Sequence, residues 1–338
     1  MYDIITFGSA AQDIHLKSKA FKILKNEKDF ITGTGICLAL GSKIDVQDIV
    51  FSTGGGGTNV AATFAKQGFK TAFCGAIGVD TSGLGIIREL KNFRIDVRFI
   101  VKKKEKRTNT SIIISSTGED RTILVYRGAS DILTGKDILW KKIKKTKWIY
   151  LAPLAGSLCD NFEGIVNFAK ENKIKIAVNP SIQQLSLPPD KLKSIFQKID
   201  ILFLNQEEAS FLTKIPFEEE QNIFKEIDKI CHGVAVMTRG GQGVVVSDGK
   251  YIYSATPNPE RKIIDTTGAG DSFAAGFLSD YIRHNGNIEK AIQLGLANSE
   301  ANLSEIGAKT GLLDKNSKFN RVKVLREECG KNNLCIQK

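Results

Sequence analysis

The segment DTTGAGDSF, residues 265–273, sets three small residues directly before a carboxylate. Gly268, Ala269 and Gly270 allow the backbone to approach an anion closely, and the first amides of a helix point outward without intrahelical partners. A phosphoryl group would be bound there, and Asp271 beside it would be placed to accept a proton from an incoming hydroxyl. On residue types alone, however, the preference of acidic residues for the first helical turn explains Asp271 better.

A run of four glycines, residues 54–57, precedes another predicted helix. It does not fit the dinucleotide pattern GxGxxG, because the sixth position is Asn59, and no glycine turn is followed by the GK[ST] of a Walker phosphate loop. A flexible turn with Asn59 as a helix cap explains the segment as well as a ligand-binding turn does. Asp13 is either a loop or cap residue or an acceptor of hydrogen bonds from two neighbouring hydroxyls.

DTTGAGDSFAAGF and GGGGTNVA resemble the two signature segments of the ribokinase-like (PfkB) carbohydrate kinase family, and the resemblance covers about residues 2–313. It implies an ATP-dependent phosphotransferase that acts on a hydroxymethyl group of a ribose- or fructose-like sugar. Asp271 would be the general base, and the amides of residues 268–270 would form the anion hole. The resemblance also implies four contacts with the acceptor, made by Asp13, Gly54, Gly55 and Asn59.

The same resemblance implies a nucleotide site and two ion sites. In LNQEEA, Asn205 and Glu208 fit a helix cap with a capping box, yet the NxxE spacing also matches the family motif that holds Mg²⁺, mostly through water. Both roles are compatible, because a cap orients the carboxylate. The other implied nucleotide contacts are Thr238, Gly240, Gly243 and Asn298. Asp265 and Thr267 align with residues that often hold a monovalent cation such as K⁺.

Two departures from the family pattern concern the acceptor. The glycine run of the family commonly reads GGKG, whereas this chain has Gly56 in place of the lysine, and the PG-containing strand that usually precedes the run is absent. An adenosine- or cytidine-like nucleoside is therefore the alternative acceptor, and an acceptor that already carries phosphate is a third option. A basic nucleic-acid-binding protein and a ligand sensor without activity are the candidates from other classes.

Short apolar runs alternate with helical stretches and predict an α/β fold with a doubly wound, mostly parallel sheet flanked by helices, because parallel neighbours need a crossover connection. Stretches that alternate with period two predict a small β-sheet lid from about residues 14–53 and 95–127. We expect one kinase domain over residues 1–313 and a C-terminal helix and tail over residues 314–338. The GAGD turn is expected to follow an apolar strand, KIID.

The composition is that of a soluble globular chain, since 42% of the 338 residues are hydrophobic and 25% are charged. No apolar run is long enough for a membrane span and no signal peptide is indicated, so we expect a cytoplasmic protein without a membrane partner. The net charge of +11 includes lysine-rich runs without stacking aromatics, which argues against nucleic acid as a partner. The expected partners are ATP, a sugar or nucleoside, and a second copy of the chain bound through the lid.

The six cysteines form no CxxC pair and have no histidines at metal-binding spacing. Zinc and a disulfide framework are therefore not expected. Cys329 and Cys335, near the end of the chain, could crosslink on oxidation, but we expect free thiols.

Overall fold

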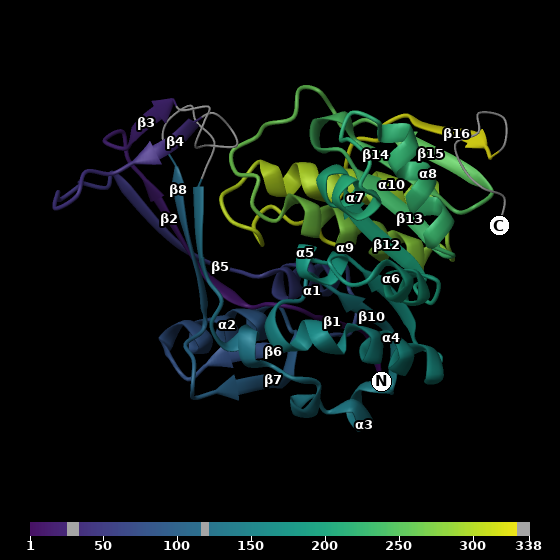
Figure 1. Ribbon diagram of the computed structural model, residues 1–338, viewed down its shortest axis with the longest axis horizontal. Coiled ribbons are helices and arrows are strands. Elements are labelled where there is room, and N and C mark those ends of the chain that lie inside the picture. The colour runs from purple at the N-terminus through teal and green to yellow at the C-terminus, as the bar shows by residue number, and fades with distance from the viewer. Residues whose placement is uncertain (26–33, 116–121, 330–338) are drawn as a thin grey trace.

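The computed structural model describes residues 1–25, 34–115 and 122–329, and at its centre is a ten-stranded sheet (Figure 1). In spatial order the strands are β7 (Asp96–Lys103), β6 (Thr71–Gly78), β1 (Tyr2–Phe7), β10 (Thr146–Leu151), β11 (Lys175–Val178), β12 (Ile201–Asn205), β13 (Val234–Thr238), β14 (Val244–Ser247), β15 (Tyr251–Ala255) and β16 (Val324–Glu328). In this order from β7 to β16, the first seven strands are parallel to one another and the last three are added in antiparallel pairs, which confirms the predicted mostly parallel sheet.

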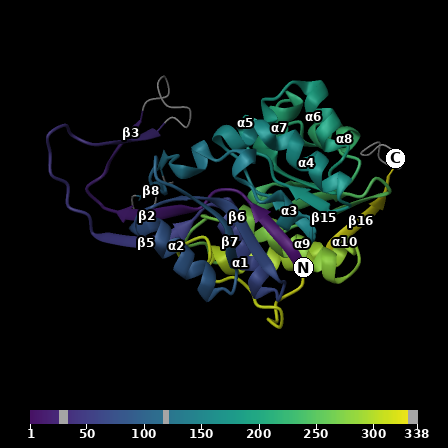
Figure 2. The ribbon, with the colours of Figure 1, turned by 90° about the horizontal axis from the view of Figure 1, so that it is seen from below.

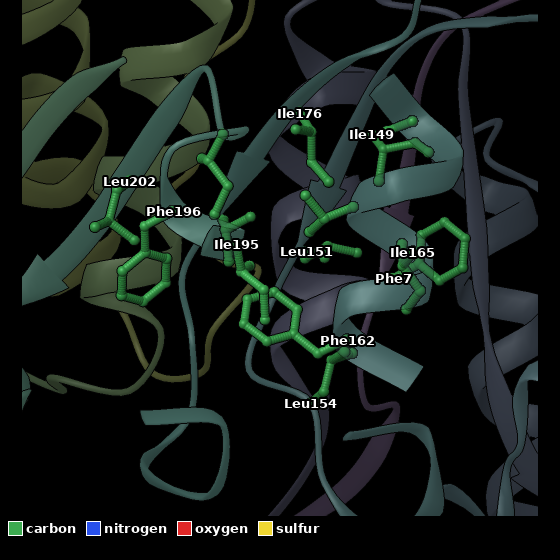
Figure 3. Packing of buried hydrophobic residues seen from close by; sticks show 14 of the residues in the cluster. Phe7, Ile149, Leu151, Leu154, Phe162, Ile165, Ile176, Ile195, Phe196 and Leu202 are labelled. Carbon is green, nitrogen blue, oxygen red and sulfur yellow. The ribbon is translucent and has the colours of Figure 1, made fainter. Parts of the chain in front are cut away.

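Helices cover both faces of this sheet, as the two views in Figures 1 and 2 show. Successive strand residues point to opposite faces. Ile149 and Leu151 therefore pack with Phe162 and Ile165 on one face (Figure 3), whereas Tyr150 between them belongs to the cluster on the other. One face carries α4 (Phe162–Glu171), α6 (Pro189–Phe196), α7 (Gln206–Thr213) and α8 (Glu220–Ile230), with the short α3 (Trp140–Ile143) and α5 (Ile182–Leu185) nearby, and the other carries α1 (Gly56–Lys66), α2 (Thr81–Asn92), α9 (Ala269–Arg283) and α10 (Ile288–Leu303).

The helices follow from apolar spacing and end signals in the sequence. In α8 the buried residues Ile223, Phe224 and Ile227 lie on one face, as expected for an amphipathic helix against a sheet. The helix α2 begins after Asp80, whose carboxylate accepts a hydrogen bond from the amide of Gly83 at 2.8 Å. None of the helices in the described residues is both long and apolar enough to cross a membrane.

A smaller sheet forms the predicted lid and lies at the left of Figure 1. Its strands in spatial order are β5 (Asp48–Gly54), β2 (Ala11–Lys17), β8 (Asn109–Ser115) and β9 (Thr122–Tyr126), and a hairpin of β3 (Lys22–Lys25) and β4 (Thr34–Cys37) extends beyond them. The lid boundary predicted at residue 95 is wrong, because residues 96–103 pair with β6 as β7, the edge strand of the main sheet. The parts of the predicted lid at residues 26–33 and 116–121 lie outside the described residues.

The expected C-terminal helix is also wrong. The segment pairs with β15 as the antiparallel strand β16, and Val322 and Val324 pack against the core with the period of two that a strand has. Cys329 is disulfide-bonded, which corrects the expectation of a free thiol at this residue, and Cys335 lies outside the described residues. The four other cysteines are free, as expected.

The two glycine-rich segments meet beside the carboxyl ends of β1 and β10. From this pair the sheet continues to β6 and β7 on one side and to β11, β12 and β13 on the other, so the strand order reverses here. A Cβ built on Gly56, the first residue of α1, would lie 3.2 Å from Cβ of Ala152 after β10 and 3.5 Å from Oδ1 of Asp271. In open α/β sheets, ligands bind in the crevice at such a reversal.

Candidate active site

The chain reaches α9 through a loop, and the strand expected before the GAGD turn is absent. Residues 256–268 contain no strand, and Ile263 and Ile264 are exposed where a central strand would bury them. The loop is held instead by backbone bonds from the amides of Ile264 and Asp265 to the carbonyl oxygen of Leu303 at the end of α10. The turn is therefore positioned by packing of α9 against α10.

The helix α9 begins at an open turn, whose amino-terminal side is not covered at Gly270 by other residues that the structure describes. Its N-cap residue, Gly268, has φ 82° and provides no side-chain cap. The amide of Ala269 donates to the carbonyl oxygen of Thr266 at 3.4 Å, whereas a Cβ built on Gly270 would meet no atom within 4 Å. Together with the dipole of a 15-residue helix, such a turn favours an anion in front of it.

Asp271 lies in the first turn of α9 and is bound by a residue from α1. Nδ2 of Asn59 donates a hydrogen bond to Oδ2 of Asp271 at 2.8 Å, which joins residues 212 positions apart in the chain. The N-cap of α1 is Gly55, so the interpretation of Asn59 as a helix cap is wrong. Among the described residues, the buried Oδ1 of Asn59 has no hydrogen-bond partner. This oxygen is therefore available to accept a hydrogen bond from a ligand beside Asp271.

Asp13 approaches the same place from the lid. It lies on β2, is 4% exposed, and is opposite Ser52 on β5 and Ser111 on β8. Its carboxylate packs against the backbone of Gly54, where a Cβ would lie 1.9 Å from Oδ2 of Asp13. Only glycine fits at residue 54, because any side chain there would displace the carboxylate.

Burial raises the pKa of Asp271 above its usual value, although the hydrogen bond from Asn59 and the charge of Lys309 act in the opposite direction. Burial likewise raises the pKa of Asp13, against a hydrogen bond from Ser111 and the charge of Lys309. A carboxylate with a raised pKa is a better proton acceptor than an ordinary one near neutral pH. Asp271 is thus a carboxyl group with a pKa raised by burial, in the first turn of α9 and directly after the open turn of residues 268–270.

The predicted nucleotide loop lies beside this turn. Thr238, Gly240 and Gly243 line a pocket of about 240 Å³, together with Ala269 and Gly270. Gly243 is required there, because its φ is 95° and a Cβ would lie 1.9 Å from the carbonyl oxygen of Ala255. The other residues that line the pocket are Gly241, Pro257, Arg261, Ile263, Thr266, Phe273, Leu296, Ser299, Glu300 and Leu303.

Arg261 is a candidate nucleotide contact that the sequence analysis missed. It lies in the loop before α9, lines the same pocket of about 240 Å³, and its Nη2 would be 3.1 Å from a Cβ built on Gly241. Arg239, the charged residue within the TxGxxG segment, instead pairs with Glu220 and donates to the carbonyl oxygen of Gln242. No motif marks Arg261, because its position depends on the folding of an irregular loop.

Asn205 and Glu208 form the predicted capping box at the start of α7. Oδ1 of Asn205 accepts from the amide of Glu208 at 2.7 Å, and Oε2 of Glu208 accepts from the amide of Asn205 at 2.9 Å and from Nδ2 of Asn179 at 3.4 Å. Burial raises the pKa of Glu208, and the nearby charge of Asp271 acts in the same direction. The described residues contain no group of three metal-binding side chains, so a metal here would need ligands from the substrate or water.

The carboxylate of Asp265 accepts hydrogen bonds from its own loop and from the segment after α10. It accepts from the amide and Oγ1 of Thr267 at 2.9 and 2.7 Å, and from the amide of Gly307 at 2.9 Å. Although burial acts to raise it, the pKa of Asp265 is lowered, because these hydrogen bonds stabilise the carboxylate. The side chains of Asp265 and Thr267 thus hold the loop together.

Asn298 does not reach the nucleotide pocket. Its side chain is fully buried, Nδ2 donates to the carbonyl oxygen of Ser272 at 2.8 Å, and Oδ1 accepts from the amide of Leu313 at 2.8 Å. These bonds tie α10 to α9 and to the segment that follows α10. The predicted nucleotide contact is therefore not made by the polar atoms of this side chain, which face the interior.

A second pocket, of about 300 Å³, lies between the lid and the loop before α9. His15 and Lys17 line this pocket on its lid side. His15 is two positions after Asp13 and therefore lies on the same face of β2. No motif in the sequence marks His15, because it is a single histidine in an irregular stretch. The other lining residues are Asp48, Val50, Ile113, Ser115, Ile264, Asp265, Thr266 and Ile306.

Comparison with known proteins assigns the chain to a family. The model of the pfkB family carbohydrate kinases matches residues 26–316. A ribokinase from Staphylococcus aureus is 27% identical over 281 residues, which cover 80% of this chain and 89% of the relative.

Two solved structures have the same fold. Arabidopsis thaliana ribokinase complexed with ribose and ATP has a TM-score of 0.76 at 20% identity, covering 93% of this chain and 96% of its own. Methanocaldococcus jannaschii nucleoside kinase has a TM-score of 0.72 at 22% identity, covering 92% and 95%. Because the family model spans most of the chain and includes both glycine-rich segments, the chain belongs to the pfkB family of carbohydrate kinases.

Proposed function

We propose that the protein transfers the γ-phosphoryl group of ATP to a hydroxymethyl group of a ribose- or fructose-like sugar. The observation that carries this proposal is the position of Asp271 between two sets of residues. On one side, Ala269 and Gly270 line the nucleotide pocket, and on the other, Asn59 binds the carboxylate of Asp271. A base at this boundary would face both the phosphoryl group and the attacking hydroxyl.

In this reaction the acceptor hydroxyl loses its proton to Asp271 while its oxygen forms a bond to the γ-phosphorus. The bond from that phosphorus to the bridging oxygen of ADP breaks. The amides at the start of α9, residues 268–270, would stabilise the charge on the transferred group, although Ala269 already makes a long bond to Thr266. Asp13 and the unpaired Oδ1 of Asn59 would accept hydrogen bonds from the other sugar hydroxyls.

Mg²⁺ would neutralise charge on the phosphates of ATP. Glu208 is the residue that fits this ion, because both hydrogen bonds to its carboxylate end at Oε2 and the nearby charge of Asp271 acts on its pKa. Mg²⁺ typically takes one or two carboxylates and completes its shell with phosphates and water. Asn205 would act through the capping box that orients Glu208, and Thr238, Gly240 and Gly243 would contact the nucleotide.

The test is a panel of acceptors with ATP and Mg²⁺: ribose, fructose, their phosphates, adenosine and cytidine. ADP release is measured together with the mass of the product, and we expect one acceptor to gain a phosphoryl group. ADP release without a phosphorylated acceptor, or no turnover with any compound, would contradict the proposal.

A nucleoside is the second candidate acceptor, and the pocket beneath the lid favours it. Its walls include Val50 and Ile113 from the lid, and Ile264 and Ile306 from the main domain. Apolar groups on two opposite sides suit the faces of a nucleobase, while the ribose would occupy the site at Asp13. A lower KM for adenosine or cytidine than for ribose would decide for this candidate. Turnover of sugar phosphates alone would assign the pocket, which includes Lys17, to a phosphate group.

We also propose that the protein dimerises through its lid and that it binds a monovalent cation. The lid presents apolar side chains on its edge strands, including Phe51 on β5, which is 63% exposed, and Leu124 and Val125 on β9, so a second copy of the chain would cover them. A monovalent cation would bind at the loop of Asp265 and Thr267. Sedimentation and a comparison of turnover in potassium and tetramethylammonium salts test these properties.

A further inference from the structure

Lys309 is a buried lysine at the base of the lid. Its side chain is 4% exposed, and it lies in the segment that follows α10. Nζ donates to the carbonyl oxygen of Thr53 at 2.9 Å and to its Oγ1 at 2.7 Å, and lies 3.3 Å from Oε2 of Glu89 on α2. Burying an ammonium group is costly unless it is paired and hydrogen-bonded. The burial of Lys309 therefore indicates a specific role for its charge and its hydrogen bonds.

The charged groups that face Lys309 come from three elements. They are Glu89 on α2, Asp13 on β2 and Asp271 on α9, and each acts to raise the pKa of the lysine, although burial outweighs them and lowers it. In return, the charge of Lys309 lowers the pKa of both Asp13 and Asp271. His15 and Asp265 also act on Asp13, with opposite signs. Lys309 thus interacts with both carboxylates of the acceptor side.

Lys309 also holds the turn that joins the lid to α1. Thr53 is the residue before Gly54, whose backbone packs against the carboxylate of Asp13, and Gly55 is the N-cap of α1. Two hydrogen bonds to Thr53 therefore fix the backbone that supports Asp13. The glycine run itself brings no cation to the site, because residues 54–57 have no side chains. The positive charge comes from a separate segment of the chain.

We propose that Lys309 is a positioning residue for phosphoryl transfer, which fixes the Thr53–Gly55 turn against Asp13 and supplies the positive charge that Asp13 and Asp271 require. The inference rests on the proposed function, because the two carboxylates act on the acceptor in that function. A lysine with a structural role alone would stabilise the protein without acting on the acceptor or on the ionisation of Asp271. The two possibilities therefore differ in kinetics and in pH dependence.

The experiment compares Lys309→Met, Lys309→Arg and Glu89→Gln with the wild type. The matched control is Lys66→Met, because Lys66 donates to the carbonyl oxygen of Leu312 in the same segment and lies 3.8 Å from Asp314, but does not act on either acceptor-side carboxylate. The kinetic readouts are kcat, the KM for ATP and the KM for the acceptor across pH. Since misplacing a reacting group by about 1 Å costs about 10²-fold, we expect kcat/KM for the acceptor to fall on the order of 10²-fold in Lys309→Met, while the KM for ATP stays near the wild-type value.

The pH profile gives the discriminating result. Without the ammonium, the pKa of Asp271 rises further, so the acid limb of kcat/KM should move to higher pH and activity should recover in part as the pH is raised. Lys309→Arg and Glu89→Gln, which keep a cation, should retain more activity than Lys309→Met. An unshifted acid limb together with a normal KM for the acceptor would overturn the proposal, even with the wild type active.

A second readout does not depend on turnover. Uncompensated carboxylates with raised pKa values destabilise the folded state increasingly as pH rises through those values. The melting temperature of Lys309→Met should therefore fall further below that of the wild type between pH 5 and about pH 8. If the difference in melting temperature between Lys309→Met and the wild type does not change with pH, the proposal is overturned. This readout holds even if no acceptor of the panel is turned over, a result that by itself contradicts only the proposed function. Lys309→Arg and Glu89→Gln provide the same comparison if Lys309→Met does not fold.

Discussion

Replacing Asp271 by asparagine removes one negative charge from the start of α9 and changes the side-chain volume very little. The hydrogen bond from Nδ2 of Asn59, 2.8 Å long in the wild type, is kept when the amide oxygen of the new residue takes the place of Oδ2. The turn formed by Gly268, Ala269 and Gly270 is not altered. Any loss of turnover in Asp271→Asn therefore reports the loss of a proton acceptor.

The expected loss is about 10²- to 10⁴-fold in kcat, the usual contribution of a general base, or about 3 to 5 kcal/mol in the barrier. Stability should change in the opposite direction. Burial raises the pKa of Asp271 in the folded state, so the ionised carboxylate destabilises the fold as pH rises through that pKa. At neutral pH and above, Asp271→Asn should melt no lower than the wild type.

The assay is steady-state turnover with the best acceptor of the panel, together with ATP binding by calorimetry and thermal melting. Asp190→Asn is the matched control, because Asp190 is an exposed aspartate in the first turn of α6. It should keep wild-type kinetics, since interaction with a helix dipole is worth only about 0.3 to 1 kcal/mol of stability. If Asp271→Asn binds ATP and retains kcat within about tenfold of the wild type, the assignment of the base is refuted.

Three other changes and one pH profile test the rest of the site. Gly54→Ala should raise the KM for the acceptor and not for ATP, because its Cβ would lie 1.9 Å from Oδ2 of Asp13; equal changes in both values would contradict this. Asn298→Ala should cost about 1 to 3 kcal/mol of unfolding free energy in urea, since it leaves the carbonyl and amide partners unpaired, with the KM for ATP little changed. Phe51→Asp should shift the sedimentation of the protein from dimer to monomer, whereas a dimer that persists would place the interface elsewhere. Because burial raises the pKa values of Asp13 and Asp271, kcat/KM should begin to fall at a higher pH than an ordinary aspartate would allow, and a profile that is flat down to pH values near 4 would contradict the assignment.

The residues of the two glycine-rich turns could be predicted because their chemistry is local. Gly268 has φ 82° and a Cβ there would lie 2.6 Å from Cβ of Ala308, and only glycine at residue 54 leaves room for Asp13. The order of apolar strands and helices likewise predicts the parallel sheet, because each crossover buries its own helix. Local sequence therefore marked the two turns, whereas the roles predicted for Asp271, Asn59 and the loop at residues 238–243 came from the resemblance to the family.

The remaining parts depend on contacts between distant segments. Residues 96–103 are mostly half-buried or exposed because β7 is an edge strand, and apolar and polar residues in such a strand are also typical of a lid hairpin. Lys309 follows Asp271 by 38 positions and reaches the site only because α9 and α10 pack as a pair. Asn298 fits a family motif by position, but its orientation depends on hydrogen bonds to Ser272 and Leu313.

The lid is joined to the main domain through β2 and β5, the strands that carry Asp13 and Gly54, and also through β8 and β9. The nucleotide loop after β13 and the open turn of α9 belong to other segments. In the proposed function, substitutions on the lid side of β2 and β5 would therefore alter the choice of acceptor, while the segments that line the pocket beside α9 stay unchanged. Under this proposal, the lid is the part of the protein in which substitutions would engineer a new acceptor specificity.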